Sequence, residues 1–279
     1  MPEGDTIFRA AQTLNRVLAG QAITQFETVF PKLSRIDFDE TIRGQTVERV
    51  EAQGKWLLMH LSGGRVLLTH MLMSGSWHIY RPGEKWHLPR SSMRVMLATE
   101  QMIAVAFNIQ IAEFHTADSL RRRAGFAELG PSLLAPDFDE AEAADRLLAM
   151  PELEVGEALL QQSVVAGIGN VCKSEICFAC GVHPFRKVAS LTRQEATNLM
   201  ATGQNFLRAN VTDSSSRQIV TYRGLRRTTA RGNPEERLWV YKRAGEPCRR
   251  CGTAIESRKQ GRDARSTFWC PECQRNRSR

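Results

Sequence analysis

Four cysteines near the end of the chain have the type and spacing of metal ligands. The stretches "CRRCG" and "CPEC" place Cys248 and Cys251, then Cys270 and Cys273, as two CxxC pairs separated by a hairpin-length insert. Four thiolates at this spacing can close a tetrahedral zinc site and hold a small segment folded. We predict one structural Zn²⁺, because the cysteines leave no position for a reacting water. The alternative, a redox-active CxxC pair, lacks its usual βαβ context.

The opening "MPEGD" offers a second kind of chemistry. A small second residue allows an aminopeptidase to remove Met1, so that the mature chain starts with the secondary amine of Pro2 beside Glu3. A neutral amine is a nucleophile, and a carboxyl group can relay protons. The alternative is an ordinary start, because proline in second place is common.

A third candidate is the turn in "LLQQSVVAGIGNVCKSE". A helical run breaks at Ala-Gly-Ile-Gly, and Asn170 is placed to cap the next helix. Glycines such as Gly169 let a ligand approach the backbone, and amides at a helix N-terminus favour an anion. We expect a phosphate here, and a plain corner between two helices is the alternative.

The distribution of charge favours a polyanionic partner. The chain has 279 residues, 42% of them hydrophobic, and a formal net charge of +8. Between Arg217 and Arg279, 17 Lys and Arg stand against 6 Asp and Glu, a surplus of 11 positive charges. Neutralised phosphates release bound counterions, so DNA is a natural partner for this segment. A solvated basic tail is the alternative.

No apolar run approaches the roughly 20 residues that a membrane helix needs, and the first residues lack a secretory signal pattern. We therefore expect a cytoplasmic protein without membrane contact. Disulfides are rare in that compartment. Cys172, Cys177 and Cys180 lie on a helix-like stretch and are expected to be small buried side chains.

The first half of the chain is predicted to be rich in β-structure behind one helix. Asp5 is a good N-cap, and apolar residues recur on one helical face from Ile7 to Leu18. Strand patterns follow at residues 46–52, 55–77 (two strands joined by a Ser-Gly-Gly turn) and 93–107. After a proline-punctuated linker, helical patterns cover residues 139–150, 156–165, 171–181 and 193–211.

Together these pieces resemble the formamidopyrimidine-DNA glycosylase and endonuclease VIII family of base-excision repair enzymes. The matching stretches follow the family order along the whole chain: "MPEGD", "GKWLL", "THMLMSGSW", "LLQQSVVAGIGN", "WVYKRAGEPCRRCG" and "RSTFWCPECQ". The resemblance implies an α+β multidomain protein with an N-terminal β-sandwich and flanking helices, a helix-two-turns-helix domain and a C-terminal zinc-ribbon finger. We place these domains at 1–125, 136–235 and 238–279. Damaged DNA is expected in the cleft between the two halves, bound by a monomer that joins the nucleoid.

The resemblance also implies roles for the first candidates. In such enzymes the N-terminal proline amine attacks C1′ of the damaged nucleoside, and Pro2 occupies that place here. Glu3 is then expected to relay protons at the sugar and the leaving base. Lys55 is expected to reach the sugar from its strand and to assist the first elimination. An ordinary solvated lysine at a strand end is the alternative for Lys55.

Further roles concern DNA binding. Arg265, in the basic hairpin between the CxxC pairs, is expected to hold phosphates and to assist the second elimination, although it is one basic residue among many. Asn170, with Gly169, matches the family's phosphate site. Met73 lies where a side chain fills the hole left by an everted base, and a core methionine is the alternative. The pattern around His70 fits a buried histidine with hydrogen-bonded ring nitrogens equally well. His70 is therefore not among the expected catalytic residues.

Several residues depart from the family patterns. Thr6 stands where glutamate is common, so a supporting carboxylate is missing or replaced by Asp5. Residues 107–114, "FNIQIAEF", stand where the formamidopyrimidine branch has Asp-Pro-Arg-Arg-Phe-Gly. Glu128 replaces an arginine of the endonuclease VIII branch. Gly4 in "PEG" favours that branch over the purine branch.

We predict a bifunctional DNA glycosylase and AP lyase that removes oxidised pyrimidines and cleaves the strand by β,δ-elimination. One alternative is a purine-preferring glycosylase of the same family. A second is a zinc-ribbon DNA-binding protein that has lost catalysis. A zinc-ribbon RNA-binding or ribosomal factor explains the finger but not the N-terminus.

Overall fold

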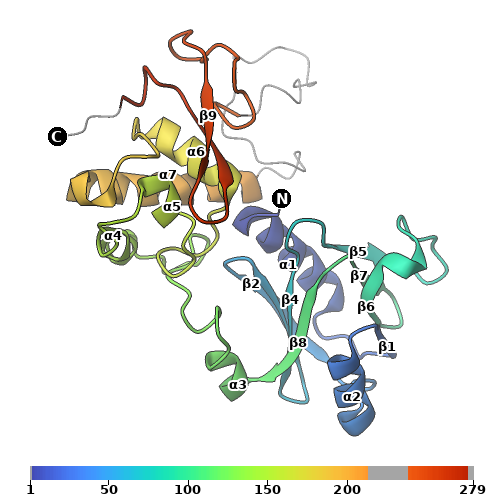
Figure 1. The fold of residues 1–279 in the computed structure, drawn as a ribbon. Coiled ribbons are helices and arrows are strands. Elements are labelled where there is room, and N and C mark those ends of the chain that lie inside the picture. The colour runs from blue at the N-terminus through green and yellow to red at the C-terminus, as the bar shows by residue number, and fades with distance from the viewer. Residues whose placement is uncertain (1, 213–237, 276–279) are drawn as a thin grey trace. The chain divides into compact units, whose positions relative to one another are not determined.

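The computed structural model describes residues 2–212 and 238–275 (Figure 1). The polar and arginine-rich stretch at 213–237 lies outside the described residues, and with it part of the predicted basic segment. The chain divides into two compact units, Met1–Glu128 and Leu129–Arg279.

The first unit contains two four-stranded sheets, which confirms the predicted β-rich architecture. One sheet has the order β1-β6-β7-β5 and the other the order β2-β3-β4-β8, with antiparallel pairing throughout. The strands are β1 (Gln25–Thr28), β2 (Val47–Gln53), β3 (Trp56–Leu61), β4 (Arg65–His70), β5 (Ser76–Tyr80), β6 (Met93–Ala98), β7 (Ile103–Phe107) and β8 (Ile111–Thr116). The predicted Ser-Gly-Gly turn joins β3 to β4, and Gly64 there has a φ of 75°.

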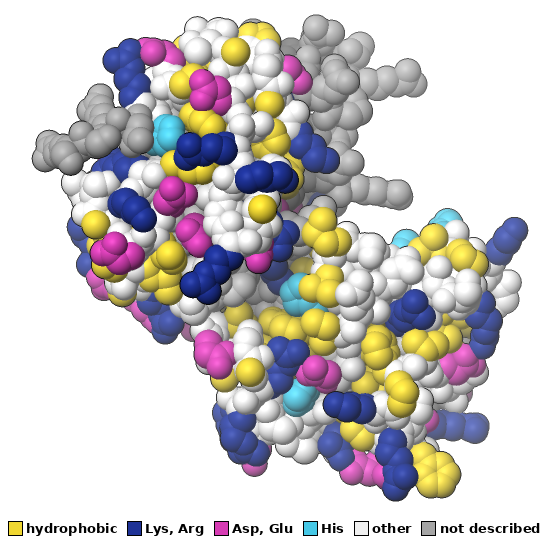
Figure 2. All heavy atoms as spheres, in the orientation of Figure 1, with side chains coloured by type: hydrophobic (Ala, Val, Ile, Leu, Met, Phe, Trp, Pro, Cys, Tyr) yellow, Lys and Arg dark blue, Asp and Glu magenta, His cyan; other side chains and the backbone are white. Residues whose placement is uncertain are grey.

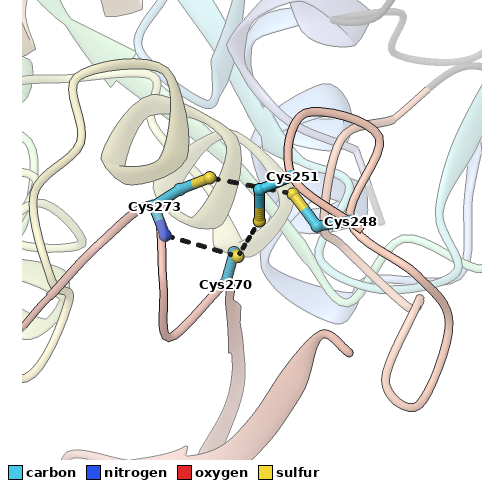
Figure 3. Close-up of side chains that lie close together, drawn as sticks. All are labelled: Cys248, Cys251, Cys270 and Cys273. Atoms are coloured by element: carbon cyan, nitrogen blue, oxygen red, sulfur yellow. Dashed lines mark hydrogen bonds between the residues drawn. The ribbon is translucent and has the colours of Figure 1, made fainter. Parts of the chain in front are cut away.

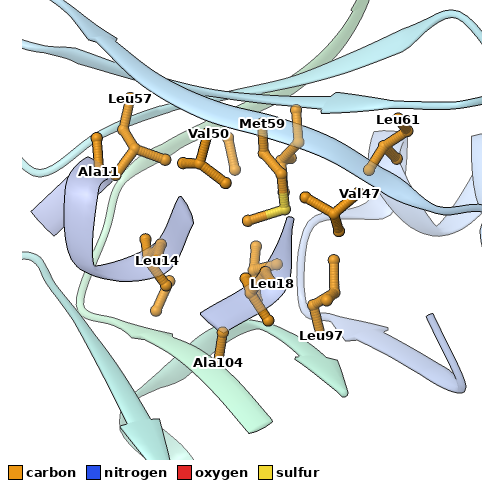
Figure 4. Packing of buried hydrophobic residues seen from close by; sticks show 14 of the residues in the cluster. Ala11, Leu14, Leu18, Val47, Val50, Leu57, Met59, Leu61, Leu97 and Ala104 are labelled. Atoms are coloured by element: carbon orange, nitrogen blue, oxygen red, sulfur yellow. The ribbon is translucent and has the colours of Figure 1, made fainter. Parts of the chain in front are cut away.

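Helix α1 joins the two sheets through one apolar core. Its buried face includes Ala11, Leu14 and Leu18, which pack with side chains of β2, β3, β6 and β7 (Figure 4). Full burial of a leucine side chain contributes about 1.5–3 kcal/mol, so this face fixes the helix on the strands. The helical segments of the unit are α1 (Gly4–Leu18), α2 (Pro31–Glu40), α3 (Ala117–Arg121) and a 3₁₀ turn at Arg90–Ser92.

The second unit is helical and ends in a two-stranded hairpin. Its elements are α4 (Glu140–Leu148), α5 (Val155–Ala158), α6 (Asn170–Ala179), a 3₁₀ turn at Val188–Ser190, α7 (Arg193–Thr212), β9 (Glu256–Gln260) and β10 (Arg265–Trp269). The helical run predicted at 156–165 is wrong beyond α5. Gln162 stabilises an irregular turn there instead, because its side chain donates to the carbonyls of Leu160 and Ile168 at 3.0 Å each and accepts from the Gly167 N–H at 3.1 Å.

Within the described ranges, every helix is too short or too polar to cross a membrane.

Candidate functional site

The start of α1 buries two carboxyl groups next to Pro2. Glu3 is the N-cap residue, Asp5 lies in the first helical turn, and both are 0% exposed, whereas Pro2 is half-buried. The prediction that Asp5 caps the helix is wrong, because the extended backbone of Glu3 starts the helix two residues earlier. Asp5 Oδ1 accepts from the Thr6 N–H at 2.7 Å, while Asp5 Oδ2 has no hydrogen-bond partner and lies 3.8 Å from Arg9 Nη2. Burial, followed by the charge of Glu3, raises the pKa of Asp5.

Lys55 lies in a two-residue turn and not, as predicted, in a strand. Gln53 of β2 pairs with Trp56 of β3, so that Gly54 and Lys55 alone form the connection. Gly54 has a φ of 58°, which such a tight hairpin turn requires. The turn holds the half-buried Lys55 at the end of the hairpin, close enough to His70 for its charge to lower the pKa of that imidazole.

His70, which the sequence left outside the catalytic set, belongs to a charged cluster beside Lys55. The Trp56 ring meets the His70 ring edge-on with centroids 4.7 Å apart, and the Arg123 guanidinium lies 4.2 Å from the Trp56 centroid. Glu113 holds Arg123 through bonds of 2.9 and 3.2 Å. Burial, then the charges of Lys55 and Arg123, lower the pKa of His70 to about 4. The imidazole is therefore neutral near pH 7.

Met73 lies in the loop between β4 and β5 and is 65% exposed, so the alternative of a core methionine is wrong. Three large hydrophobic side chains are exposed among the described residues: Val29, Phe38 and Met73.

Two of the departures from the family pattern, Thr6 and Glu128, have local structural roles. The Thr6 hydroxyl donates to Asp5 Oδ1 at 3.3 Å and so helps to fix that carboxyl group. Glu128 accepts a hydrogen bond from the backbone N–H of Gly125 and closes a turn.

In the second unit, Gly169 and Asn170 form the start of α6. Gly169 is the N-cap residue, and Asn170 is the first helical residue and not the predicted cap. The reason is that Asn170 Nδ2 donates to the Ser266 carbonyl at 2.8 Å, which directs the side chain to the hairpin. Asn170 Oδ1 is buried without a hydrogen-bond partner. A ten-residue helix with glycine as its N-cap presents its N-terminal amides and the positive end of its dipole, a suitable site for a phosphate.

Arg265 begins β10 and pairs with Gln260 of β9 in the predicted hairpin. Its side chain is 42% exposed, and Arg265 Nη2 lies 3.4 Å from Asp263 Oδ2. The contact between Asn170 and Ser266 thus brings two predicted site segments together. Pro2, Glu3, Lys55 and Met73 belong to the first unit.

A buried polar network fixes the hairpin on the helical core. Lys173 Nζ donates to Thr267 Oγ1 at 2.6 Å, and Thr267 Oγ1 donates to Gln260 Oε1 at 2.9 Å. Gln260 Nε2 donates to Glu154 Oε2 at 2.9 Å and to the Pro184 carbonyl at 2.8 Å. Lys173 and Thr267 are 0% exposed. Buried polar groups are costly to leave unpaired. This network therefore favours a single position of the hairpin on the helical core.

A second buried charge holds the segment that leads to the cysteines. The carboxylate of Glu175, 0% exposed, accepts from the backbone N–H groups of Trp239, Val240 and Tyr241 at 2.8, 3.0 and 2.8 Å. Neither Lys173 nor Glu175 was predicted as a functional residue from the sequence. The sequence signal for such buried, paired charges is the occurrence of two charged residues within an apolar helical stretch.

The four cysteines gather at the end of the second unit (Figure 3). All four sulfur atoms lie within 4.8 Å of one another, with Cys251–Cys270 at 3.4 Å and Cys248–Cys273 at 3.9 Å. Tetrahedral zinc with Zn–S bonds of about 2.3 Å separates sulfurs by about 3.8 Å. The backbone N–H of Arg250 donates to Cys248 Sγ at 3.4 Å. The donor set fits zinc.

Lys and Arg side chains do not form one patch on the face shown in Figure 2, where Asp and Glu are interspersed with them on both units.

Comparisons with protein families cover most of the chain. Residues 1–110 match the formamidopyrimidine-DNA glycosylase N-terminal domain, and residues 129–221 match the formamidopyrimidine-DNA glycosylase H2TH domain. Residues 245–276 match the zinc finger found in FPG and IleRS.

Similar proteins span the same length. The chain is 39% identical over 277 residues to the probable endonuclease 8 2 of Streptomyces coelicolor, covering 98% of this chain and 94% of that protein. It is 35% identical over 274 residues to the DNA-(apurinic or apyrimidinic site) lyase Nei2 of Mycolicibacterium smegmatis, covering 98% and 99%. A Lactococcus lactis Fpg solved in complex with DNA containing an abasic site has the same fold, with a TM-score of 0.81, 21% identity and coverage of 98% and 100%. The chain belongs to the formamidopyrimidine-DNA glycosylase and endonuclease 8 family.

Proposed function

We propose that the protein is a bifunctional DNA glycosylase and AP lyase of base-excision repair. The observation that carries this proposal is the start of α1, where Pro2 precedes two fully buried carboxyl groups in a chain of this family. A relative is named as an AP-site lyase, and structural neighbours were solved with abasic-site DNA.

Pro2 is the nucleophile. Its nitrogen lone pair forms a bond to C1′ as the bond from C1′ to the base breaks, and the base leaves with that electron pair and takes up a proton relayed by Glu3. The Pro2 nitrogen, now an ammonium, gives up its proton to Glu3. The freed lone pair then forms a charged iminium with C1′ as the bond from C1′ to the ring oxygen breaks, and Glu3 delivers the proton to that oxygen. The iminium withdraws electrons, so loss of a C2′ proton expels the 3′ phosphate, with Lys55 assisting. A second elimination, assisted by Arg265, expels the 5′ phosphate, and water releases Pro2.

The positive end of α1 is expected to raise the neutral fraction of the Pro2 amine. The positive end of α1 disfavours an ammonium ion, an effect of about 0.3–1 kcal/mol at such positions. A nearby carboxylate acts in the opposite direction. The raised pKa of Asp5 extends upward the pH range in which Asp5 is protonated and adds no negative charge beside the amine.

Contacts to DNA come from both units. The α6 start at Gly169 and Asn170 binds a phosphate through backbone amides, and Arg265 binds phosphates from the hairpin. Met73, exposed on its loop, occupies the space that the everted base vacates. One zinc ion on Cys248, Cys251, Cys270 and Cys273 is structural, because the cysteines fill all four positions. The enzyme acts on chromosomal DNA as a monomer in the cytoplasm, associated with the nucleoid.

Oxidised pyrimidines are the proposed lesions. Gly4 and the absence of the Asp-Pro-Arg-Arg-Phe-Gly run favour them over 8-oxoguanine. Borohydride trapping on oligonucleotides with thymine glycol, dihydrouracil or 8-oxoguanine tests both the Schiff-base mechanism and the lesion preference. An adduct with the pyrimidine lesions supports the proposal, and an adduct with 8-oxoguanine alone assigns the chain to the purine-preferring alternative. DNA binding with no adduct on any lesion or abasic site identifies a protein without catalysis.

A further inference from the structure

The loop that carries Met73 has an unusual backbone. Leu72 has a φ of 48°, in the left-handed region that disfavours residues with a branched side chain. A leucine stays in this conformation only where its surroundings hold it there.

Two hydrogen bonds keep this part of the loop in place. The backbone N–H of Leu72 donates to His70 Nδ1 at 3.0 Å, and the backbone N–H of Gly75 donates to the Met71 carbonyl at 2.8 Å. Gly75 has no room for a side chain, because a Cβ there would lie 2.5 Å from the Met71 oxygen and 2.8 Å from Ile109 Cγ2. The loop is therefore closed tightly on both sides of Met73.

The His70 ring is itself fixed from the neighbouring strand. His70 and Trp56 are cross-strand partners in β4 and β3, and their rings meet edge-on. The charges that face His70 are those of Lys55, on the β2–β3 turn, and Arg123, which follows α3 and is paired with Glu113 of β8. Since the pKa of His70 is lowered to about 4, its Nδ1 remains an unprotonated acceptor and its Nε2 carries the proton.

Met73 stands out from the surface because of this loop. Its side chain is 65% exposed, whereas Met71 two residues earlier is 3% exposed. A relaxed loop would let an apolar side chain fold back onto the protein, since burial of that surface is favourable. Holding Leu72 at positive φ prevents this.

We propose that His70 is a positioning residue for Met73: by accepting the Leu72 N–H, it holds the loop in the conformation that presents Met73 for insertion into DNA. This inference rests on the proposed role of Met73 in base eversion. It assigns His70 a function through the protein backbone, distinct from any contact that its Nε2–H makes with DNA.

A set of four variants tests the proposal. His70→Leu removes the acceptor. Leu72→Gly places a residue that adopts positive φ readily, and the double variant His70→Leu/Leu72→Gly asks whether that freedom replaces the hydrogen bond. Met73→Ala measures the effect of removing the side chain that is proposed to insert into DNA. The readouts are the fluorescence of 2-aminopurine next to the lesion, which rises as stacking is lost, and single-turnover excision.

We expect Leu72→Gly to behave like the unsubstituted protein. His70→Leu and Met73→Ala should both lose most of the fluorescence change and slow excision by about 10- to 100-fold, the usual range for a misplaced group. The double variant should recover a large part of both signals, because glycine needs no support at this φ. His70→Asn, whose Oδ1 can accept in place of Nδ1, should also retain them.

Other outcomes would contradict either the role of His70 or the role of Met73. If the double variant is as defective as His70→Leu, His70 acts through the DNA or through the core and the proposal is wrong. If Met73→Ala retains the full fluorescence change, the proposed role of Met73 is wrong, which is a separate result. Far-UV circular dichroism and thermal melting of each variant identify any loss of folding. If His70→Asn melts normally but loses the fluorescence change, the proposal is also contradicted.

Discussion

The buried ammonium group of Lys173 donates a 2.6 Å hydrogen bond to the hydroxyl of Thr267, two positions after Arg265 in the hairpin. Asn170, three residues before Lys173 on α6, donates to the carbonyl of Ser266. Two successive residues of β10 are thus fixed to one turn of α6. The position of Arg265 relative to the proposed phosphate site is therefore set by polar contacts inside the second unit, and these contacts can be tested separately from the zinc site.

Thr267→Val should destabilise the second unit and weaken DNA binding. Valine keeps the shape of threonine but removes a hydroxyl that pairs with both Lys173 and Gln260. A buried polar group left without its partner costs about 1–3 kcal/mol. Thermal unfolding and fluorescence anisotropy with abasic-site DNA measure the two effects. Thr267→Ser retains the hydroxyl and is the matched control. Unchanged melting and binding of Thr267→Val would show that the network does not position the hairpin.

Asp5→Asn should stabilise the protein at neutral pH. Burial and the charge of Glu3 raise the pKa of Asp5 above its ordinary value of 3.8. Between that value and the raised one, the folded state binds more protons than the unfolded state, so stability falls as pH rises through this window. Asparagine removes the buried charge. The gain over the unsubstituted protein should be small at pH 4, grow as pH rises, and reach about 1–3 kcal/mol, the usual cost of a poorly satisfied buried polar group.

Thermal denaturation at several pH values measures this gain. Asp37→Asn is a suitable control, because Asp37 also accepts a backbone hydrogen bond but lies on the surface helix α2. A gain that does not depend on pH would mean that charge burial at Asp5 is not its source.

Patterns of residue type predicted the parts of the site that depend on local sequence. The cysteine spacing gave the metal ligands, and the repeat from Ile7 to Leu18 gave the buried face of α1. Asp5 was predicted as a cap because aspartate is common there. Its burial was not predictable, because it depends on where the preceding backbone starts the helix.

Contacts between distant segments were beyond the reach of such patterns. Lys173 and Thr267 are 94 positions apart, and no local spacing relates them. Met73 lies in an apolar stretch that reads as core, yet a turn with positive φ at Leu72 turns it to the surface. Lys55 reads as a strand residue because the residues that follow it are apolar, and only the pairing of Gln53 with Trp56 shows that it lies in a turn.

Removal of zinc should abolish strand cleavage, whereas loss of Arg265 should leave the metal bound. Cys270→Ser takes one thiolate from the four-sulfur site and should release the ion. Arg265→Ala should retain one zinc by metal analysis and bind DNA more weakly. Each lost phosphate contact lowers the log–log salt slope by about 0.9 on duplex DNA, so titrations at several salt concentrations measure the effect. Normal binding and cleavage by Arg265→Ala would contradict its proposed role.

Blocking the Pro2 nitrogen should stop catalysis and leave DNA binding largely intact. The proposed reaction needs a free neutral amine at the chain's end, and retained Met1 converts that amine to an amide, which has no available lone pair. Base excision and borohydride trapping should therefore both disappear in a protein with an uncleaved N-terminal extension. Its melting temperature is the control for folding. Full activity with Met1 retained would rule out Pro2 as the nucleophile.

Glu3→Gln should separate the two reactions of the enzyme. It keeps the amine but removes the proton relay, so excision of an intact lesion should slow by about 10²- to 10⁴-fold, the usual contribution of general acid–base catalysis. An abasic site has already lost its base, so cleavage there needs no proton transfer to a leaving base and should be less affected. Comparing the two rates in one assay measures the difference, and mass spectrometry of the digested, reduced adduct locates the cross-link. A cross-link on the Pro2 peptide supports the mechanism, whereas a cross-link on Lys55 would assign the nucleophile to the β2–β3 turn.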